Sequence, residues 1–437
     1  MRIKQNNPIF GDDGFRSKYG KGLMSKKNIE SFSKSISNYI FIKKLNKYPI
    51  IIARDTRKSG ENIEKIIVTL VTKLGINITL AGILPTPGLS KLIELNKYAC
   101  GIMITASHNP ASDNGIKLFS KSGYKMLSNE EKIIENGMRK KLSFQKPASI
   151  GEINYLRNAS LQYTNKIRKY LKNVSPKVRI AIDCANGAMI EPVNNFFREH
   201  INCTIINDKP NGKNINHKCG ALESDRLLKF IKKNNIDIGI AFDGDGDRAI
   251  FVSNEYGVIE SEKIFFLLCI NSSKNIRKDS VVVSEVFNYG TIIFLRNYFD
   301  NVWVTNAGDR NVIEKVKQKK SLSGAEPSGH FNFPNISRSM DGLVSMVMLI
   351  KLVNKPNFNL NERLKNIPKY KRIIKNINIE NIKIDNIKLK KINKICLTED
   401  ERILVRISMW NPIIRIYYDY KIKNNFNLYH QKIISLL

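Results

Sequence analysis

One short segment of the chain places three aspartates on alternate residues. The segment, FDGDGDR, follows an apolar run typical of a buried strand, and a glycine stands between each pair of acids. Glycine lets the backbone curl tightly enough to turn the carboxylates toward one point, where a hard cation such as Mg²⁺ would bind. A calcium-binding loop is excluded, because its sixth position needs glycine and its twelfth glutamate, where this chain has Arg248 and Asn254. The alternative is an acidic surface turn. The predicted ligands are Asp243, Asp245 and Asp247.

A second segment, GIMITASHNPASDNG at residues 101–115, surrounds Ser107 with turn-forming and polar residues. An ordinary chain reversal needs only two or three such residues. A serine hydroxyl is a weak nucleophile without a base or a metal, and no His/Asp pair is evident. The simplest interpretation is a phosphoserine linked to the metal, with Lys117 neutralising the phosphate or moving a proton. The alternative is a long exposed loop without a function.

Two further clusters could recognise a substrate. In GAEPSGH, Glu326 and Ser328 can hydrogen-bond sugar hydroxyls, and His330 can transfer protons near neutral pH. In RISMWNPIIR, residues 406–415, two arginines and a serine could clamp a phosphate, as Arg248 beside the aspartates could also do. Alone, the first would be a solvated turn and the second a basic strand pair.

Alternating strands and helices must position these clusters. Short β-branched apolar runs end in polar or glycine-rich residues, whereas residues 59–75 have helical periodicity, with Ser59 as a plausible cap and Gly75 at the end. This alternation predicts α/β architecture with mainly parallel sheets and sites at the carboxyl ends of strands. The tail after residue 367 is more strand-like and ends on an amphipathic stretch. The predicted strands lie within residues 48–54, 100–106, 177–187, 235–244 and 279–286.

Composition points to a multidomain globular protein of the cytoplasm. The chain has 437 residues, 42% of them hydrophobic, and its six cysteines form no C-x-x-C pair. Its start has no signal-peptide core, and the apolar run at 343–350 is too short to cross a bilayer. The net charge is +33. Its lysines are spread along the whole chain together with Asn and Ile, and they form no basic stripe interleaved with aromatic residues. We therefore expect no nucleic-acid partner and no membrane.

The four clusters, in this order, resemble those of the α-D-phosphohexomutase family over essentially the whole chain. TASHNP looks like the family's phosphoserine loop, DGDGDR its Mg²⁺ loop, EPSGH its sugar-recognition loop, and RISMWNPIIR its phosphate-binding loop. Within the family, the details are most similar to the bacterial phosphoglucosamine mutases. The similar segments are IFGDDGFRSKYG, DNGIKLFSKSGYKM, NGKNINHKCGA, GDRNVIEK and NPIIRIYY.

The resemblance implies four domains around a central cleft: three α/β sandwiches and a smaller C-terminal α+β domain. The corresponding boundaries are 1–153, 154–254, 255–366 and 367–437. It implies interconversion of glucosamine 6-phosphate and glucosamine 1-phosphate, through a bisphosphate, for amino-sugar nucleotide and cell-wall synthesis. The partner would be a hexosamine phosphate, and the protein a monomer or homodimer.

The resemblance also implies roles for individual residues. One Mg²⁺ per subunit would bind Ser107, Asp243, Asp245 and Asp247, and Ser107 would need phosphorylation for activity. The catalytic residues would be Arg16, Ser107, Lys117, Arg248 and His330. The substrate-binding residues would be Glu326, Ser328, Arg406, Ser408 and Arg415.

This sequence departs from the family pattern in two loops. The phosphate loop usually reads R-K-S-G-T-E-P, and here Ile407, Met409, Trp410 and Asn411 replace several of its donors. The opening loop has Asp12 and Ser17 where Thr and Gly are usual. Two alternatives stay open: a glucose- or mannose-specific mutase, and a basic binding protein on a decayed mutase scaffold.

Overall fold

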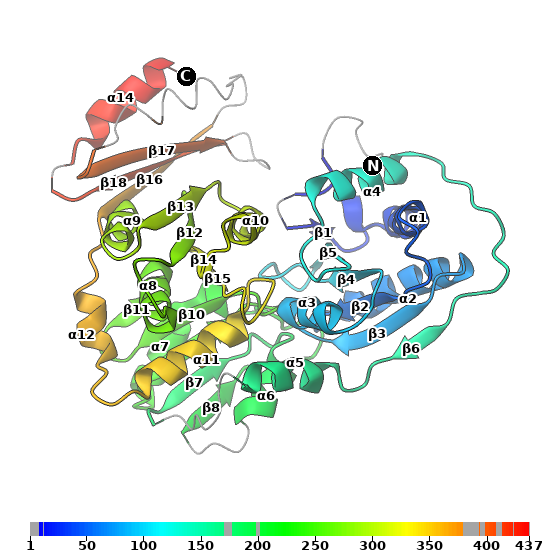
Figure 1. Cartoon of the computed structure of the whole chain (residues 1–437), viewed down its shortest axis with the longest axis horizontal. Helices are drawn as coiled ribbons and strands as arrows, with labels where there is room; N and C mark the ends of the chain where they lie inside the picture. Colours follow the sequence, from blue (N-terminus) through cyan, green and yellow to red (C-terminus); the bar gives the residue numbers. More distant parts are fainter. Residues whose placement is uncertain are drawn as a thin grey trace. The chain divides into compact units, whose positions relative to one another are not determined.

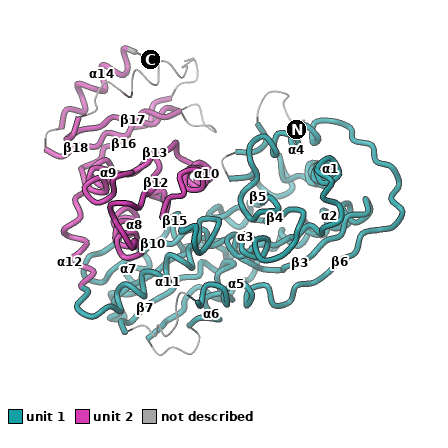
Figure 2. The backbone as a smooth tube through the Cα atoms, in the orientation of Figure 1, with its two compact units in different colours: residues 1–259, 328–358 teal, residues 260–327, 359–437 magenta. Residues whose placement is uncertain are grey.

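The computed structural model describes most of the chain as two compact units (Figure 2). One comprises residues 1–259 and 328–358, and the other residues 260–327 and 359–437. No helix within the described part of the chain is long and apolar enough to span a membrane. The described residues are 8–11, 13–169, 177–197, 202–378, 393, 398–407, 413–422 and 424–436.

The first unit begins with a six-stranded sheet in the order β1-β5-β4-β2-β3-β6 (Figure 1). The strands β2, β3, β4 and β6 are parallel, and β5 runs antiparallel to β4 and to β1. The strands are β1 (Phe15–Lys18), β2 (Ile50–Arg54), β3 (Ile78–Ile83), β4 (Cys100–Ile104), β5 (Asp113–Ser120) and β6 (Ile153–Tyr155). The helical segments are η1 (Gly22–Met24), α1 (Lys26–Ile42), α2 (Lys58–Lys73), α3 (Thr86–Leu95) and α4 (Ser128–Arg139).

Both faces of this sheet are covered by helices. In β2, Ile50 and Ile52 join a core formed with α1, α2 and α4, whereas Ile51 and Ala53 join a second core formed with α3. Alternate residues of a strand point to opposite faces, so a run of apolar residues is required when both faces are buried. The apolar strand predicted within residues 48–54 is therefore confirmed.

A five-stranded sheet follows in the same unit, in the order β11-β10-β9-β7-β8. The strands β7, β8 and β9 are parallel, and β10 turns back antiparallel to β9. The helices α7 and α11 both pack against β10. The strands of this sheet are β7 (Ile180–Asp183), β8 (Cys203–Ile206), β9 (Ile238–Phe242), β10 (Ala249–Ser253) and β11 (Gly257–Ile259), and the unit also contains β15 (His330–Asn332), which is not part of this sheet. The helical segments are α5 (Ala159–Arg168), α6 (Ile190–Phe197), η2 (Ala221–Glu223), α7 (Ser224–Lys233) and α11 (Gly342–Val353).

The second unit contains a parallel sheet and a separate antiparallel one. In the parallel sheet β12 lies between β13 and β14, and in the antiparallel sheet β18 lies between β16 and β17, with α14 covering one face. The strands are β12 (Ser280–Ser284), β13 (Asn301–Thr305), β14 (Ser323–Glu326), β16 (Lys371–Asn378), β17 (Glu401–Ile407) and β18 (Ile413–Tyr420). The helices are α8 (Ser261–Ser272), α9 (Tyr289–Arg296), α10 (Asp309–Lys319), α12 (Leu360–Lys365) and α14 (Phe426–Leu436).

These elements confirm the predicted fold class, with three α/β domains and a smaller α+β domain at the C-terminus. The five predicted strands correspond to β2, β4, β7, β9 and β12, while the predicted domain boundaries stay predictions. The predicted serine cap of α2 is wrong. The helix begins at Lys58 after Arg57, and Ser59 instead accepts a hydrogen bond from the Asn114 amide at 2.9 Å.

A buried carboxylate attaches the C-terminal sheet to the parallel sheet's domain. Asp419 of β18 is fully buried and accepts hydrogen bonds from Arg372 at 2.6 and 2.9 Å and from Arg402 at 2.9 Å. The same carboxylate accepts the backbone N–H of Tyr289, at the start of α9, at 3.1 Å. Arg372 also donates to the Val286 carbonyl, and Arg402 also donates to the Phe287 carbonyl. Asp419 therefore fixes the strand that also carries Arg415.

Replacing Asp419 should destabilise this part of the second unit. Removing one member of a buried ion pair costs about 3 to 5 kcal/mol, because the partner charges stay buried. We expect Asp419→Asn to lower the free energy of unfolding, measured in urea, by that amount. The control is Asp400→Asn, whose half-exposed pair with Lys421 spans 3.6 Å and should contribute little. Equal stability of the two variants would contradict the account.

Candidate active site

Ser107 lies in the loop that joins β4 to β5, at the carboxyl end of a buried parallel strand. Its hydroxyl donates to Oδ2 of Asp243 at 2.7 Å and lies 3.3 Å from Nδ1 of His108. Its backbone has a φ of +51°, in the left-handed region that a residue with a Cβ rarely adopts. The serine is fully buried, so the alternative of a merely exposed loop is wrong at this residue.

The three predicted aspartates lie in the turn that joins β9 to β10, and all three are buried. One oxygen from each lies within 4.8 Å of the other two. Two glycines make the turn possible. Gly246 has a φ of +72°, and Gly244 lets the serine loop approach closely, because a Cβ at Gly244 would lie only 2.7 Å from the Ser107 carbonyl oxygen. The aspartate turn and the serine loop are therefore in direct contact.

Lys117 of β5 holds this acidic cluster together. Its Nζ lies 2.7 Å from Oδ2 of Asp245, 2.7 Å from Oδ2 of Asp247 and 2.9 Å from Oδ2 of Asp13. Burial favours the neutral amine, but the three carboxylates outweigh it and raise the pKa of Lys117 well above its usual value. The lysine is therefore a cation in this arrangement.

The acidic cluster is electrostatically crowded. Burial, followed by the charges of Asp247 and Asp245, raises the pKa of Asp243 to about 7. Burial also opposes ionisation of Asp247, but Lys117 and His330 lower its pKa well below the usual value. Oδ1 of Asp245 is buried and has no hydrogen-bond partner. Clustered hard oxygens, one of them unsatisfied, fit a divalent cation such as Mg²⁺.

Two predicted residues meet beside the aspartates. Nε of Arg248 donates to Nε2 of His330 at 3.1 Å and lies 3.7 Å from Oδ2 of Asp243. The same Nε2 lies 3.1 Å from Oδ1 of Asp247, and Nδ1 of His330 lies 2.9 Å from the Ser328 hydroxyl. The imidazole thus links a predicted sugar-binding serine to a predicted metal ligand.

Asp13 belongs to the site but was not predicted from the sequence. It contacts Lys117, Lys125 and Arg16, and these cations hold its pKa well below the usual value although burial opposes this. Arg16 also donates to the Ala106 carbonyl at 3.3 Å. The acid-rich GDDG segment before Arg16 was the available signal. Ser17 binds only backbone groups of Lys21 and Met24, and Asp12 lies outside the described residues.

The remaining predicted residues belong to the second unit. Oε1 of Glu326 accepts the backbone N–H of Gly308 at 2.7 Å, at the start of α10. Arg406 on β17 and Arg415 on β18 are cross-strand partners, which agrees with the interpretation of this segment as a basic strand pair. Arg406 also forms an ion pair with Glu285 at 3.0 Å. Ser408 lies outside the described residues.

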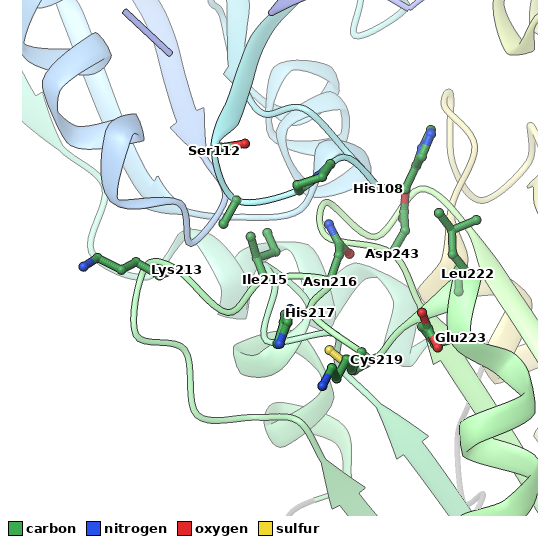
Figure 3. A pocket seen from close by; sticks show the side chains of 14 residues that line it. His108, Ser112, Lys213, Ile215, Asn216, His217, Cys219, Leu222, Glu223 and Asp243 are labelled. Carbon is green, nitrogen blue, oxygen red and sulfur yellow. The ribbon is translucent and has the colours of Figure 1, made fainter. Parts of the chain in front are cut away.

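A pocket of about 580 Å³ lies beside the serine loop (Figure 3). His108 and Asp243 line it together with residues 213, 215–219 and 221–223. Burial, with the positive charges of Arg248 and Arg16, lowers the pKa of His108 to about 4. The imidazole is therefore neutral near pH 7.

The fold is that of the phosphohexomutases, and comparison with known proteins agrees. Family models described as phosphoglucomutase/phosphomannomutase alpha/beta/alpha domains I, II and III match residues 7–144, 161–257 and 260–370. The chain belongs to the α-D-phosphohexomutase family. Members of this family generally use Mg²⁺ and a phosphoserine.

Among particular proteins, the chain is similar to bacterial phosphoglucosamine mutases. It is 31% identical to that of Oceanobacillus iheyensis, covering 98% of both chains. It is 30% identical to that of Buchnera aphidicola subsp. Baizongia pistaciae, covering 98% of this chain and 96% of the relative.

Solved structures share the fold at lower identity. A phosphoglucomutase/phosphomannomutase family protein from Burkholderia thailandensis aligns with a TM-score of 0.82 at 18% identity, covering 98% of this chain and 96% of that one. The N-acetylphosphoglucosamine mutase of Aspergillus fumigatus, solved with GlcNAc-6P and magnesium, has a TM-score of 0.65 at 14% identity, covering 99% and 96%.

Proposed function

We propose that this chain is a phosphoglucosamine mutase, which interconverts glucosamine 6-phosphate and glucosamine 1-phosphate. The observation that carries the proposal is the 2.7 Å hydrogen bond from the Ser107 hydroxyl to Asp243, inside a buried cluster of three carboxylates. The bacterial relatives at 30 to 31% identity carry this name over nearly their full length.

The proposed active form carries a phosphate on Ser107 and one Mg²⁺ per subunit. The ligands would be Asp243, Asp245, Asp247 and the phosphorylated serine. When bound, Mg²⁺ would stabilise the negative charge that develops on the transferred phosphoryl group. Arg16 and Arg248, both near the aspartates, would hold the phosphoryl oxygens by charge-assisted hydrogen bonds.

In the proposed first step, the phosphorus–oxygen bond at Ser107 breaks and a bond forms from phosphorus to the free sugar hydroxyl. The sugar hydroxyl loses its proton to a base, and the departing serine oxygen gains one. Lys117 is suited to donate, because Asp13 and the aspartate turn keep it protonated. His330 is suited to accept, because it can transfer protons near neutral pH. The resulting bisphosphate then returns its other phosphate to Ser107 by the reverse transfer.

Substrate recognition would use five further predicted residues. Glu326 and Ser328 would hydrogen-bond sugar hydroxyls. Arg406, Ser408 and Arg415 would hold the phosphate that is not being transferred. In the structure Arg406 is paired with Glu285, so a substrate phosphate would have to replace that carboxylate. The ion pair supports the proposal, because a guanidinium that pairs with a carboxylate can also pair with a phosphate.

The function is tested by steady-state turnover on glucosamine 6-phosphate, glucose 6-phosphate and mannose 6-phosphate. We expect kcat/KM to be highest for the glucosamine substrate. Preference for glucose or mannose phosphate would indicate the corresponding mutase. No turnover on any of them, with salt-dependent binding of labelled DNA, would indicate a binding protein on a decayed scaffold.

The altered phosphate loop should raise KM while leaving kcat near normal. Distant phosphate contacts position the substrate, and each charge-assisted hydrogen bond contributes roughly 1.5 to 3 kcal/mol. We expect restoration of the family pattern to lower KM by about tenfold or more, since each 1.4 kcal/mol is tenfold in affinity. The restored variant combines Ile407→Lys, Met409→Gly, Trp410→Thr and Asn411→Glu. An unchanged KM would mean that these donors contribute little.

A further inference from the structure

Every N–H group of the Arg57 guanidinium donates a hydrogen bond, either to the serine loop or to one aspartate. Arg57 and Asp55 are both fully buried, and Nε of Arg57 donates to Oδ2 of Asp55 at 2.9 Å. The terminal nitrogens donate to four backbone carbonyls of the loop, which match the remaining donors of the five that a guanidinium offers. Those carbonyls belong to Ser107, Asn109, Pro110 and Asp113.

The same aspartate also reaches the amide side of Ser107. The Thr105 hydroxyl donates to Oδ2 of Asp55 at 2.7 Å and accepts the Ser107 backbone N–H at 2.9 Å. Both the N–H and the carbonyl of Ser107 are therefore connected to one buried carboxylate, through Thr105 and through Arg57.

Asn216 holds the loop from the neighbouring α/β domain. Its Nδ2 donates to the carbonyls of Ser107 at 2.8 Å and Asn109 at 3.2 Å, which are the two that one Arg57 nitrogen also binds. Figure 3 shows this amide directed toward the loop that carries His108. Asn216 itself has a φ of +57°, and its N–H is fixed by the Ala185 carbonyl at 2.9 Å.

We propose that Arg57 and Asn216 are positioning residues that together hold Ser107 in its left-handed conformation. Such a conformation persists only where the surroundings over-determine it. Here two side chains from different domains bind one carbonyl, and the conformation directs the hydroxyl toward Asp243. Phosphorylation would modify only the Ser107 hydroxyl, so the carbonyl oxygens that accept from these donors would stay chemically the same. The inference rests on the proposed function for its kinetic consequence.

Asn216→Gly tests the proposal, because glycine tolerates the positive φ and only the amide is lost. We expect kcat to fall at least tenfold with KM within twofold, because the phosphoserine loses its alignment while distant phosphate contacts stay. Arg57→Lys should act in the same direction, since an ammonium has three donors where five are needed. Amide hydrogen exchange in residues 105–116 should accelerate in both variants.

The matched control is Ile67→Ala, which opens the hydrophobic core of the domain that carries Arg57 but removes no hydrogen bond to the serine loop. It should lower the melting temperature yet leave kcat and the exchange of residues 105–116 at wild-type values. Wild-type exchange of residues 105–116 in Asn216→Gly would overturn the proposal, as would wild-type kcat. If the wild type turns over no sugar phosphate, the proposed function fails, while the exchange comparison still decides the positioning role.

Discussion

Replacing Ser107 by alanine is expected to abolish turnover in a protein that still folds. Alanine has no oxygen to carry the phosphoryl group, so no bisphosphate can form. The structural cost is small, because the hydroxyl donates one hydrogen bond to Asp243, and such a bond to a charged group contributes about 1.5 to 3 kcal/mol. Mass spectrometry of the active wild type should show one phosphate, and fragmentation should assign it to Ser107.

The control for this variant is Ser112→Ala in the same loop. Ser112 is exposed, and its hydroxyl reaches only the Asp113 carboxylate, at 3.2 Å. It should keep the phosphate and near wild-type activity. Full activity in a preparation of the wild type that carries no phosphate on Ser107 would exclude the phosphoserine mechanism.

Asp245→Asn is expected to reduce kcat by roughly a thousandfold or more, which corresponds to about 4 kcal/mol of transition-state stabilisation. The amide keeps the size of the side chain and one of its oxygens, but it removes the negative charge of one of the three clustered carboxylates. Chelation should abolish wild-type activity, and added Mg²⁺ should restore it. Calorimetric titration of Mg²⁺ into the variant should show weaker binding.

A partly exposed aspartate that precedes the same strand provides the control. Asp237 is close to half exposed and pairs with Arg179 at 3.9 Å, far along β9 from the turn. Asp237→Asn should keep both the Mg²⁺ affinity and the rate of the wild type. If Asp245→Asn instead turned over like the wild type at limiting Mg²⁺, the metal assignment would be wrong.

The sequence predicted those parts of the site whose residues are close together in the chain. The three aspartates lie within five consecutive positions after β9, so strand alternation and glycine were enough to group them. The strand before Ser107 was predicted from its apolar residues. The Arg406–Arg415 pair also followed from local pattern, because two strands so close together in the sequence are expected to pair.

The missed parts depend on contacts between distant segments. Asp13 joins the site only because β1 pairs with β5, where Gly115 and Ile116 face Arg16 and Phe15. Arg57 lies two residues before the predicted start of a helix at Ser59, and nothing local shows that its side chain crosses to the serine loop. The predicted serine cap is wrong for a similar reason, because the Ser59 hydroxyl accepts a hydrogen bond from the distant Asn114 and the helix already begins at Lys58. No local pattern connects Asn216, on a loop of the next domain, to the Ser107 carbonyl.

The most direct test of the central claim follows a labelled phosphate from Ser107. Enzyme carrying ³²P on Ser107 is mixed with glucosamine 6-phosphate in a single turnover and quenched over time. The account predicts that label leaves the protein, appears in glucosamine bisphosphate and then in glucosamine 1-phosphate, with little in inorganic phosphate. Formation of unlabelled glucosamine 1-phosphate while the label stays on the protein would contradict it.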